Sequence, residues 1–89
     1  MAEIQLLIRN QLGLHARACA LFVKAASRFK SEITVSRDDL VVNGKSIMGV
    51  MMLAAGKGSR ITLETEGPDE SEAMDALVAL IGDCFGEGQ

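Results

Sequence analysis

Hydrophobic and polar residues along this chain follow two periods, one of two residues and one of three to four. Residues 3–8 alternate, which predicts a first β-strand with Ile4, Leu6 and Ile8 facing inward. After a loop, residues 16–29 carry apolar side chains at steps of three and four. The chain is therefore predicted to begin with a strand and an amphipathic helix.

The middle of the chain predicts two further strands and a short helix. Residues 32–36 alternate, and residues 40–42 form a short apolar run after a turn. Ser46 is a favourable N-cap residue for a helix that we expect to end near Ala54 or Ala55, stopped by Gly56 and Gly58.

The last third of the chain predicts one more strand and a final helix. Residues 60–66 alternate again, and the turn residues 67–69 lead into the helix. Gly86 and Gly88 are expected to fray its end. Its inward-facing residues are expected to be Ala73, Leu77, Leu80, Ile81 and Cys84.

The predicted order of elements is β-α-β-β-α-β-α within one domain spanning residues 1–89. Each strand has one apolar side and the helices are amphipathic. We therefore expect an α+β fold in which the helices cover one face of a mostly antiparallel sheet. The other face of the sheet is expected to be solvated.

Composition narrows the class of protein. The 89 residues are 48% hydrophobic, yet no apolar run is long enough to cross a membrane and no export signal is recognisable. Cys19 and Cys84 have no metal-binding spacing and are expected to be reduced, packed thiols. These observations predict a cytoplasmic protein without a bound metal.

Charge is distributed unevenly along the chain, although the net charge is only −3. Between Glu3 and Glu32 the charged residues are all basic, and after Ile61 they are all acidic. An acidic chain without aromatic residues in its basic stretch is unlike a nucleic-acid-binding protein. The basic half suits an acidic partner or a small anion, unless both halves are merely solvated surfaces.

The two long helices begin differently. Asp69, Glu70 and Glu72 lie at the start of the last helix, where Asp69 and Glu72 resemble a capping box. The first helix has no acid in its opening turn and carries Arg17 there instead. A cation at that end costs about 0.3–1 kcal/mol, and a bound anion would offset this cost.

His15, the single histidine, falls at the N-cap of the first helix. Histidine is a poor capping residue, so local stability does not explain its place. A neutral imidazole nitrogen is a nucleophile toward phosphorus, and Arg17 with the helix N-terminus would hold the phosphate oxygens. The alternative is a surface histidine that happens to precede a helix.

The short helix offers two further candidates. The hydroxyl of Ser46 caps the helix and lies where a phosphate would also be favourable. The helix itself is apolar almost all round, so some of its side chains either lie under loops or form a docking surface. The apolar residues of this helix are Ile47, Met48, Val50, Met51, Met52 and Leu53, and some of them are expected to lie in the core.

Two motifs carry a resemblance to a known family. Residues 13–17, Gly-Leu-His-Ala-Arg, and residues 45–51, Lys-Ser-Ile-Met-Gly-Val-Met, are similar to the active-site and serine-phosphorylation regions of HPr, the histidine-containing phosphocarrier of the bacterial sugar phosphotransferase system. The resemblance covers nearly the whole chain. It implies an open-faced β-sandwich, with a four-stranded antiparallel sheet and three helices on one face.

The resemblance also implies roles for individual residues. His15 would accept a phosphoryl group on Nδ1 from enzyme I and pass it to enzyme IIA domains, and Arg17 would steady the phosphate. Ser46 would be a regulatory site for an HPr kinase/phosphorylase, and Ile47, Met48 and Met51 would belong to the docking surface. The protein would be a monomeric carrier, neither an enzyme nor dependent on a cofactor.

One departure and three alternatives remain at this point. Ala18 stands where the family usually has proline, which is expected to leave the helix intact but to loosen its first turn. A nitrogen-related HPr-like carrier would serve regulation instead of sugar uptake. A small binding module would leave His15 idle, and a small enzyme using His15 as an acid or base lacks a nearby carboxylate partner.

Overall fold

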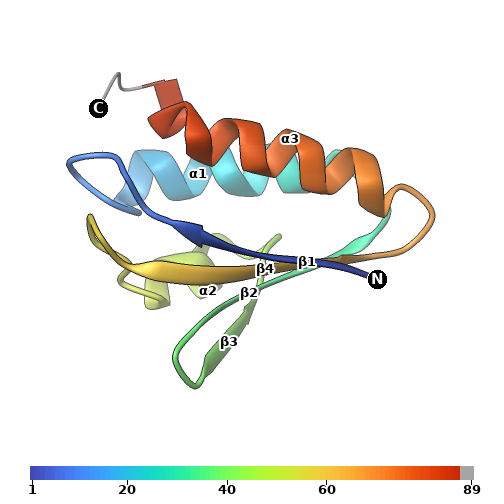
Figure 1. The fold of residues 1–89 in the computed structure, drawn as a ribbon, viewed down its shortest axis with the longest axis horizontal. Helices are drawn as coiled ribbons and strands as arrows, with labels where there is room; N and C mark the ends of the chain where they lie inside the picture. The colour runs from blue at the N-terminus through green and yellow to red at the C-terminus, as the bar shows by residue number, and fades with distance from the viewer. Residues whose placement is uncertain (87–89) are drawn as a thin grey trace.

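A computed structural model describes residues 1–86 of the chain, which build one sheet and a layer of helices (Figure 1). A short 3-10 turn, Cys84–Gly86, follows the last helix. The predicted fraying residue Gly88 lies outside the described part. The elements in chain order are β1 (Ala2–Leu7), α1 (Ala16–Ala26), β2 (Glu32–Arg37), β3 (Leu40–Asn43), α2 (Ile47–Met52), β4 (Arg60–Glu66) and α3 (Glu70–Gly82).

The four strands are all antiparallel to their neighbours and lie in the order β1-β4-β2-β3. The long helices α1 and α3 run side by side over one face of the sheet (Figure 1), and α2 contacts α1 and β3. The predicted α+β architecture, with a four-stranded antiparallel sheet and three helices, is confirmed.

The core lies between the sheet and the helices. On β4 the alternation places Ile61, Leu63 and Thr65 on the buried side, as predicted. The helices contribute a few large side chains, among which Phe22 of α1 and Leu77 of α3 are almost completely buried. The other face of the sheet is mostly polar, but Leu7 of β1 and Val41 of β3 are exposed apolar residues on it.

Three boundaries or orientations differ from the prediction. Ile4 is 38% exposed, because β1 is an edge strand and only partly covered. Helix α1 ends at Ala26, and the amides of Arg28 and Phe29 bond three residues back, which tightens the chain into turns. The last predicted core residue, Cys84, is only partly buried because it lies beyond the end of α3.

Helix α2 ends at Met52, earlier than predicted, and the glycines that follow do not stop it. Leu53 is its C-cap, and Ala54 then takes a left-handed conformation with φ of +50°. That conformation is unusual for a residue with a side chain. The local sequence does not favour this sharp turn, so contacts with other parts of the fold hold it.

The predicted capping box at the start of α3 is wrong. Asp69 is the N-cap residue but makes no side-chain capping bond. Its carboxylate instead accepts hydrogen bonds from the backbone amides of Lys30 and Ser31, at 2.9 Å each, and from the Ser31 hydroxyl. Asp69 thus ties the start of α3 to the segment between α1 and β2. The carboxylate that turns back is that of Glu70, which accepts from the Gly67 amide at 3.1 Å.

Candidate functional site

The loop between β1 and α1 is fixed by hydrogen bonds at both ends. At its start, the Ile8 amide donates to the Ser59 carbonyl at 2.8 Å. At its end, the Leu14 amide donates to the Ala55 carbonyl at 2.8 Å. Inside the loop, the buried side chain of Asn10 donates through Nδ2 to the Gly13 carbonyl at 2.8 Å. The residues that precede the first helix are therefore held in place.

Gly13 is required at its position for two reasons. Its φ is +65°, which glycine adopts without strain. A Cβ there would also lie 2.6 Å from the Ala55 carbonyl oxygen, which is closer than side-chain atoms tolerate. The close packing of this turn against Ala55 sets the direction in which the chain enters α1.

His15 is the N-cap residue of α1, as predicted. Its backbone is extended, with φ of −77° and ψ of 177°, and its carbonyl accepts the amide of Cys19 at 2.9 Å. The imidazole makes no capping bond to the helix, and the residue is partly exposed. The side chain therefore stands at the positive end of the helix and within reach of solvent.

The first turn of α1 has the predicted charge distribution. It contains no acidic residue, and Arg17 is exposed at its second helical position. Amide groups in the first turn of a helix have no carbonyl partner within the helix. An anion bound beside His15 would therefore meet both backbone donors and a guanidinium.

Ala18 and Cys19 lie on the opposite side of this turn, and neither is exposed to solvent. The Cys19 thiol donates to the Leu14 carbonyl at 3.3 Å, and burial raises its pKa. A protonated, enclosed thiol is a poor nucleophile and a poor target for oxidants. Cys19 is therefore the packed thiol that the sequence predicts.

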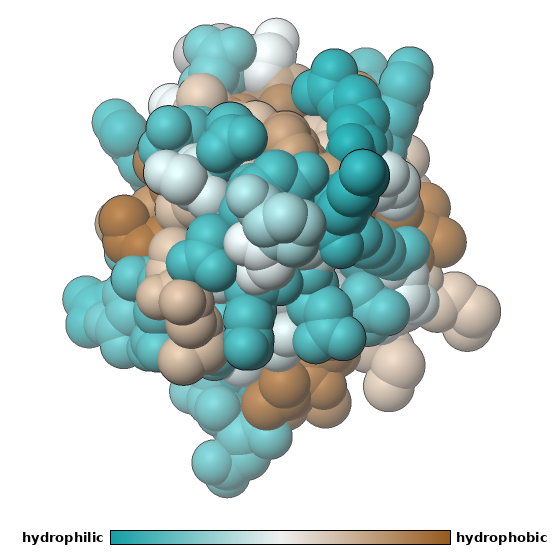
Figure 2. All heavy atoms as spheres, turned by 90° about the vertical axis from the view of Figure 1, so that its right-hand side faces the viewer, coloured by the Kyte–Doolittle hydropathy of each residue, from teal (hydrophilic) through white to brown (hydrophobic). Residues whose placement is uncertain are grey.

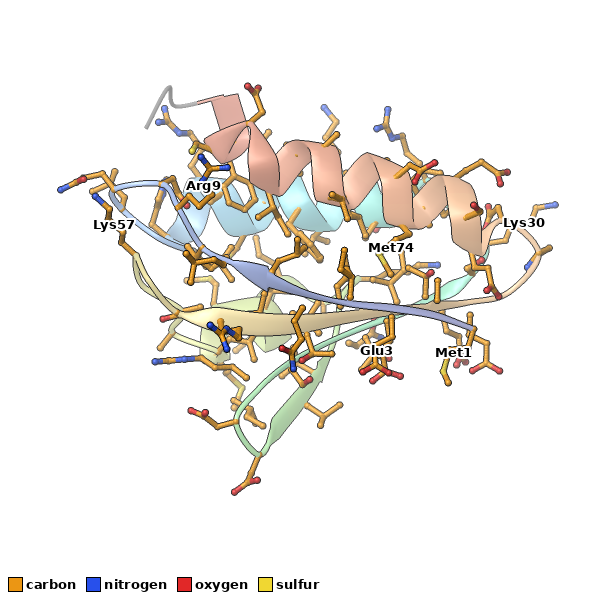
Figure 3. The ribbon with its side chains drawn as sticks, viewed as in Figure 1. Met1, Glu3, Arg9, Lys30, Lys57 and Met74 are labelled. Carbon is orange, nitrogen blue, oxygen red and sulfur yellow. The ribbon has the colours of Figure 1, made fainter. Side chains whose placement is uncertain are left out.

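Cationic side chains surround this end of the molecule. Figure 3 shows Arg9 and Lys57 on the loops beside the start of α1, whereas Met1 and Glu3 lie at the other end of the sheet. Lys57 donates through Nζ to the Gln11 side chain at 3.1 Å, which joins two of these loops. In Figure 2, which shows the side of the molecule opposite the start of α1 in Figure 1, hydrophilic side chains predominate.

Ser46 caps α2 as predicted. Its hydroxyl oxygen accepts the Gly49 amide at 3.1 Å, and the residue is partly exposed. The helix has 6 residues, so its axis is about 9 Å long. Ser46 stands at one end of this short helix, and the segment that contacts Leu14 follows its other end.

The predicted docking residues of α2 are exposed in the structure. The exposed fractions are 42% for Ile47, 72% for Met48 and 45% for Met51. The buried side of the same helix is formed by Val50, with Leu53 just beyond its end. The three residues that the resemblance assigns to the docking surface therefore lie on the solvent side of α2.

Met52 and Leu12 are exposed apolar residues on the elements beside the site, and neither is among the predicted site residues. Met52 is 64% exposed at the end of α2, and Leu12 is 65% exposed in the loop before His15. Leu12 has no periodic neighbours in its loop, so the sequence pattern could not indicate its exposure. Met52 follows Met51 in an apolar run whose orientation only the folded helix determines.

Within residues 1–86, no three His, Cys, Asp or Glu residues gather in a way that could hold a metal ion. The helices of the same part of the chain are too short or too polar to span a bilayer.

Comparison with known proteins identifies the family. A family model described as the PTS HPr component phosphorylation site matches residues 2–83. The chain belongs to the HPr family. Phosphocarrier protein HPr of Cupriavidus necator is 62% identical over 82 residues, which are 92% of each chain. HPr-like protein Crh of Halalkalibacterium halodurans is 57% identical over 81 residues, 91% of this chain and 96% of Crh.

Solved HPr structures share the fold. An HPr structure from Thermoanaerobacter tengcongensis superposes with a TM-score of 0.95 at 52% identity and covers 98% of both chains. Membership in the HPr family makes this protein a phosphocarrier of the phosphotransferase system, which carries a phosphoryl group between other proteins. It is not a catalyst that converts a small molecule.

Proposed function

We propose that His15 is the residue that carries the phosphoryl group. One observation supports this assignment above the others: His15 is the N-cap of a helix whose first turn lacks acids and contains the exposed Arg17. The position is unfavourable for stability unless an anion binds there at some stage. A phosphoryl group on the imidazole is such an anion.

The proposed transfer is a displacement at phosphorus. A neutral imidazole nitrogen, Nδ1 by resemblance to the family, attacks the phosphorus of phosphorylated enzyme I. The new nitrogen–phosphorus bond forms as the bond to the enzyme I carrier atom breaks, and an enzyme IIA domain then removes the group by the same chemistry. Arg17 and the first-turn amides of α1 balance the charge of the phosphate oxygens in between.

The docking surface proposed for these partners is the exposed side of α2. Ile47, Met48 and Met51 offer flexible apolar side chains that adapt to differently shaped partners. The loops nearby carry Arg9 and Lys57, which suit partners with acidic surfaces. Enzyme I and enzyme IIA domains would therefore use the same face in turn.

Ser46 is proposed to be a regulatory phosphorylation site for an HPr kinase/phosphorylase. Its partly exposed hydroxyl lies at a helix N-terminus, where a phosphate is tolerated without loss of the helix. A phosphate there would add negative charge beside Ile47 and Met48. We expect this charge to hinder the association with enzyme I.

We further propose that the protein works as a monomer in the cytoplasm. The free state of Cys19 and Cys84 agrees with a reducing compartment. Size-exclusion chromatography with light scattering at micromolar concentration should give the mass of one chain. A stable dimer would contradict the proposed monomer.

Incubation with enzyme I and phosphoenolpyruvate tests the central proposal. We expect the wild-type protein to gain one acid-labile phosphate by mass spectrometry, because phosphohistidine hydrolyses in acid. His15→Ala should gain none. Ser46→Ala is the matched control and should gain the same acid-labile phosphate as the wild type.

Two results would contradict the proposal. The first is a wild-type protein that takes up no phosphate, which would favour a binding module with an idle histidine. The second is an undiminished acid-labile phosphate in His15→Ala.

A further inference from the structure

Arg37, the last residue of β2, reaches across to the end of α2. Its side chain donates through one terminal nitrogen, Nη1, to the Leu53 carbonyl at 2.9 Å and to the Ala54 carbonyl at 3.1 Å. The residue is only partly exposed. This contact joins the β2–β3 side of the sheet to the C-terminus of the short helix.

The contact meets two needs of that helix end. The last carbonyls of a helix lack partners within the helix and carry the negative end of its dipole. The first turn after α2 also contains Ala54 in the left-handed region, a strained conformation that requires support from its surroundings. A guanidinium supplies both donors and positive charge at this place.

The residue after this turn contacts the loop that precedes His15. Ala55 is buried, and its carbonyl accepts the Leu14 amide at 2.8 Å. Gly13 packs so closely on the same carbonyl that a side chain would not fit. The position of Ala55 therefore helps to determine where Leu14, and next to it His15, is placed.

We propose that Arg37 is a positioning residue for phosphoryl transfer, acting through the turn Leu53–Ala55 on the backbone that orients His15. Its charge also offsets the negative end of α2 next to a site that must receive an anion. The inference rests on the proposed role of His15. It adds a residue of β2 whose observed contacts are with the turn after α2, not with His15 itself.

The variant Arg37→Met tests the proposal, because methionine has a similar length but lacks donors and charge. We expect the Leu14 amide to exchange its hydrogen faster than in the wild type. The kcat of phosphorylation by enzyme I should fall by about 10-fold, since a small misplacement of a reacting group has an effect of this order or larger. KM for enzyme I should stay within about twofold, because the proposed docking residues are unchanged.

Two further variants complete the test. Arg37→Lys keeps the cation and a donor, and should recover part of both losses. Arg60→Met removes an exposed arginine at the start of β4 and serves as the matched control for charge. It should leave both the Leu14 exchange rate and kcat at the wild-type values.

The outcomes separate the two proposals. Unchanged Leu14 exchange in Arg37→Met, an unchanged kcat, or an equal fall of kcat in Arg60→Met would overturn the role of Arg37. Hydrogen exchange requires no phosphoryl transfer, so it reports on the contact independently of His15. A wild-type protein that takes no phosphate on His15 would overturn the proposed function, and with it any part of Arg37 in transfer.

Discussion

Asp69 shows how a single residue takes a role that its sequence neighbours do not indicate. The hydrogen bonds from Ser31 and from the backbone of Lys30 lower the pKa of its carboxyl group from 3.8 to about 2. All of these donors come from a segment more than thirty residues earlier in the chain. The local sequence predicts a capping box with Glu72, and the tertiary contact replaces it.

The first prediction at this scale concerns acid unfolding. A carboxyl whose pKa is lower in the folded state stabilises the fold above its unfolded pKa, and this contribution is lost as pH falls. The contribution of Asp69 should therefore disappear between pH 3.8 and about 2. Asp69→Asn should be less stable than the wild type at pH 7 and lose less stability over this range.

Urea unfolding at a series of pH values measures this effect. Glu72→Gln is the control, because it changes a carboxyl of α3 that has no part in the Ser31 contact. If Asp69→Asn and the wild type lose stability in parallel between pH 4 and pH 2, the assigned role of Asp69 is wrong.

At the scale of elements, the two helices beside the site differ in what holds them. Helix α1 buries one side against the core, with Phe22 almost fully enclosed. Helix α2 has only 6 residues and a single buried one, Val50. A helix this short does not form in isolation, so its caps matter more. Ser46 holds one end and Arg37 holds the other.

The prediction for α2 separates two roles of Ser46, which are the capping of the helix and the regulation of phosphoryl transfer. Ser46→Ala should lower the free energy of unfolding by about 1 kcal/mol, because the Gly49 amide loses its acceptor. Ser46→Asp keeps a capping oxygen and should cost less stability than Ser46→Ala. It should nevertheless slow phosphorylation by enzyme I, whereas Ser46→Ala should not.

Denaturant unfolding and the phosphorylation rate, measured on both variants, check this pair of effects. Equal phosphorylation rates in both variants would mean that Ser46 is only a cap in this protein. A more stable Ser46→Ala would contradict the capping role.

At the scale of the whole molecule, four glutamate side chains from distant parts of the chain gather on the uncovered face of the sheet. The strand register places Glu64 of β4 directly opposite Glu3 of β1, and Glu66 directly opposite Glu32 of β2. Like charges in such positions destabilise a sheet. These pairs come from distant parts of the chain, so only the strand order brings them together.

The corresponding prediction is that Glu64→Gln stabilises the protein, by about 0.2–1 kcal/mol at low salt. The gain should shrink as added salt screens the repulsion. Glu72→Gln removes the same charge from the first turn of α3, where an acid is favourable, and should destabilise instead. Thermal unfolding at low and high salt measures both, and changes of the same sign would refute the pairwise explanation.

The sequence by itself determined the order of elements, the buried faces of the central strands and the N-cap positions of His15 and Ser46. These features depend on periodicity and on residues next to each other in the chain, which local physics relates directly to structure. The local apolar excess of α2 predicted that some of its side chains would stay exposed, whereas the resemblance to the HPr family singled out Ile47, Met48 and Met51.

Only the tertiary structure decided how α2 ends, which partner Asp69 takes and that Arg37 reaches the turn beside Leu14. Each depends on groups that are distant in the chain and adjacent in the fold, so no local pattern could indicate them. The exposure of Leu12 and Ile4 was decided in the same way, because it depends on what covers a loop and an edge strand. His15 is thus recognisable from its neighbours, whereas the support that orients it comes from the rest of the fold.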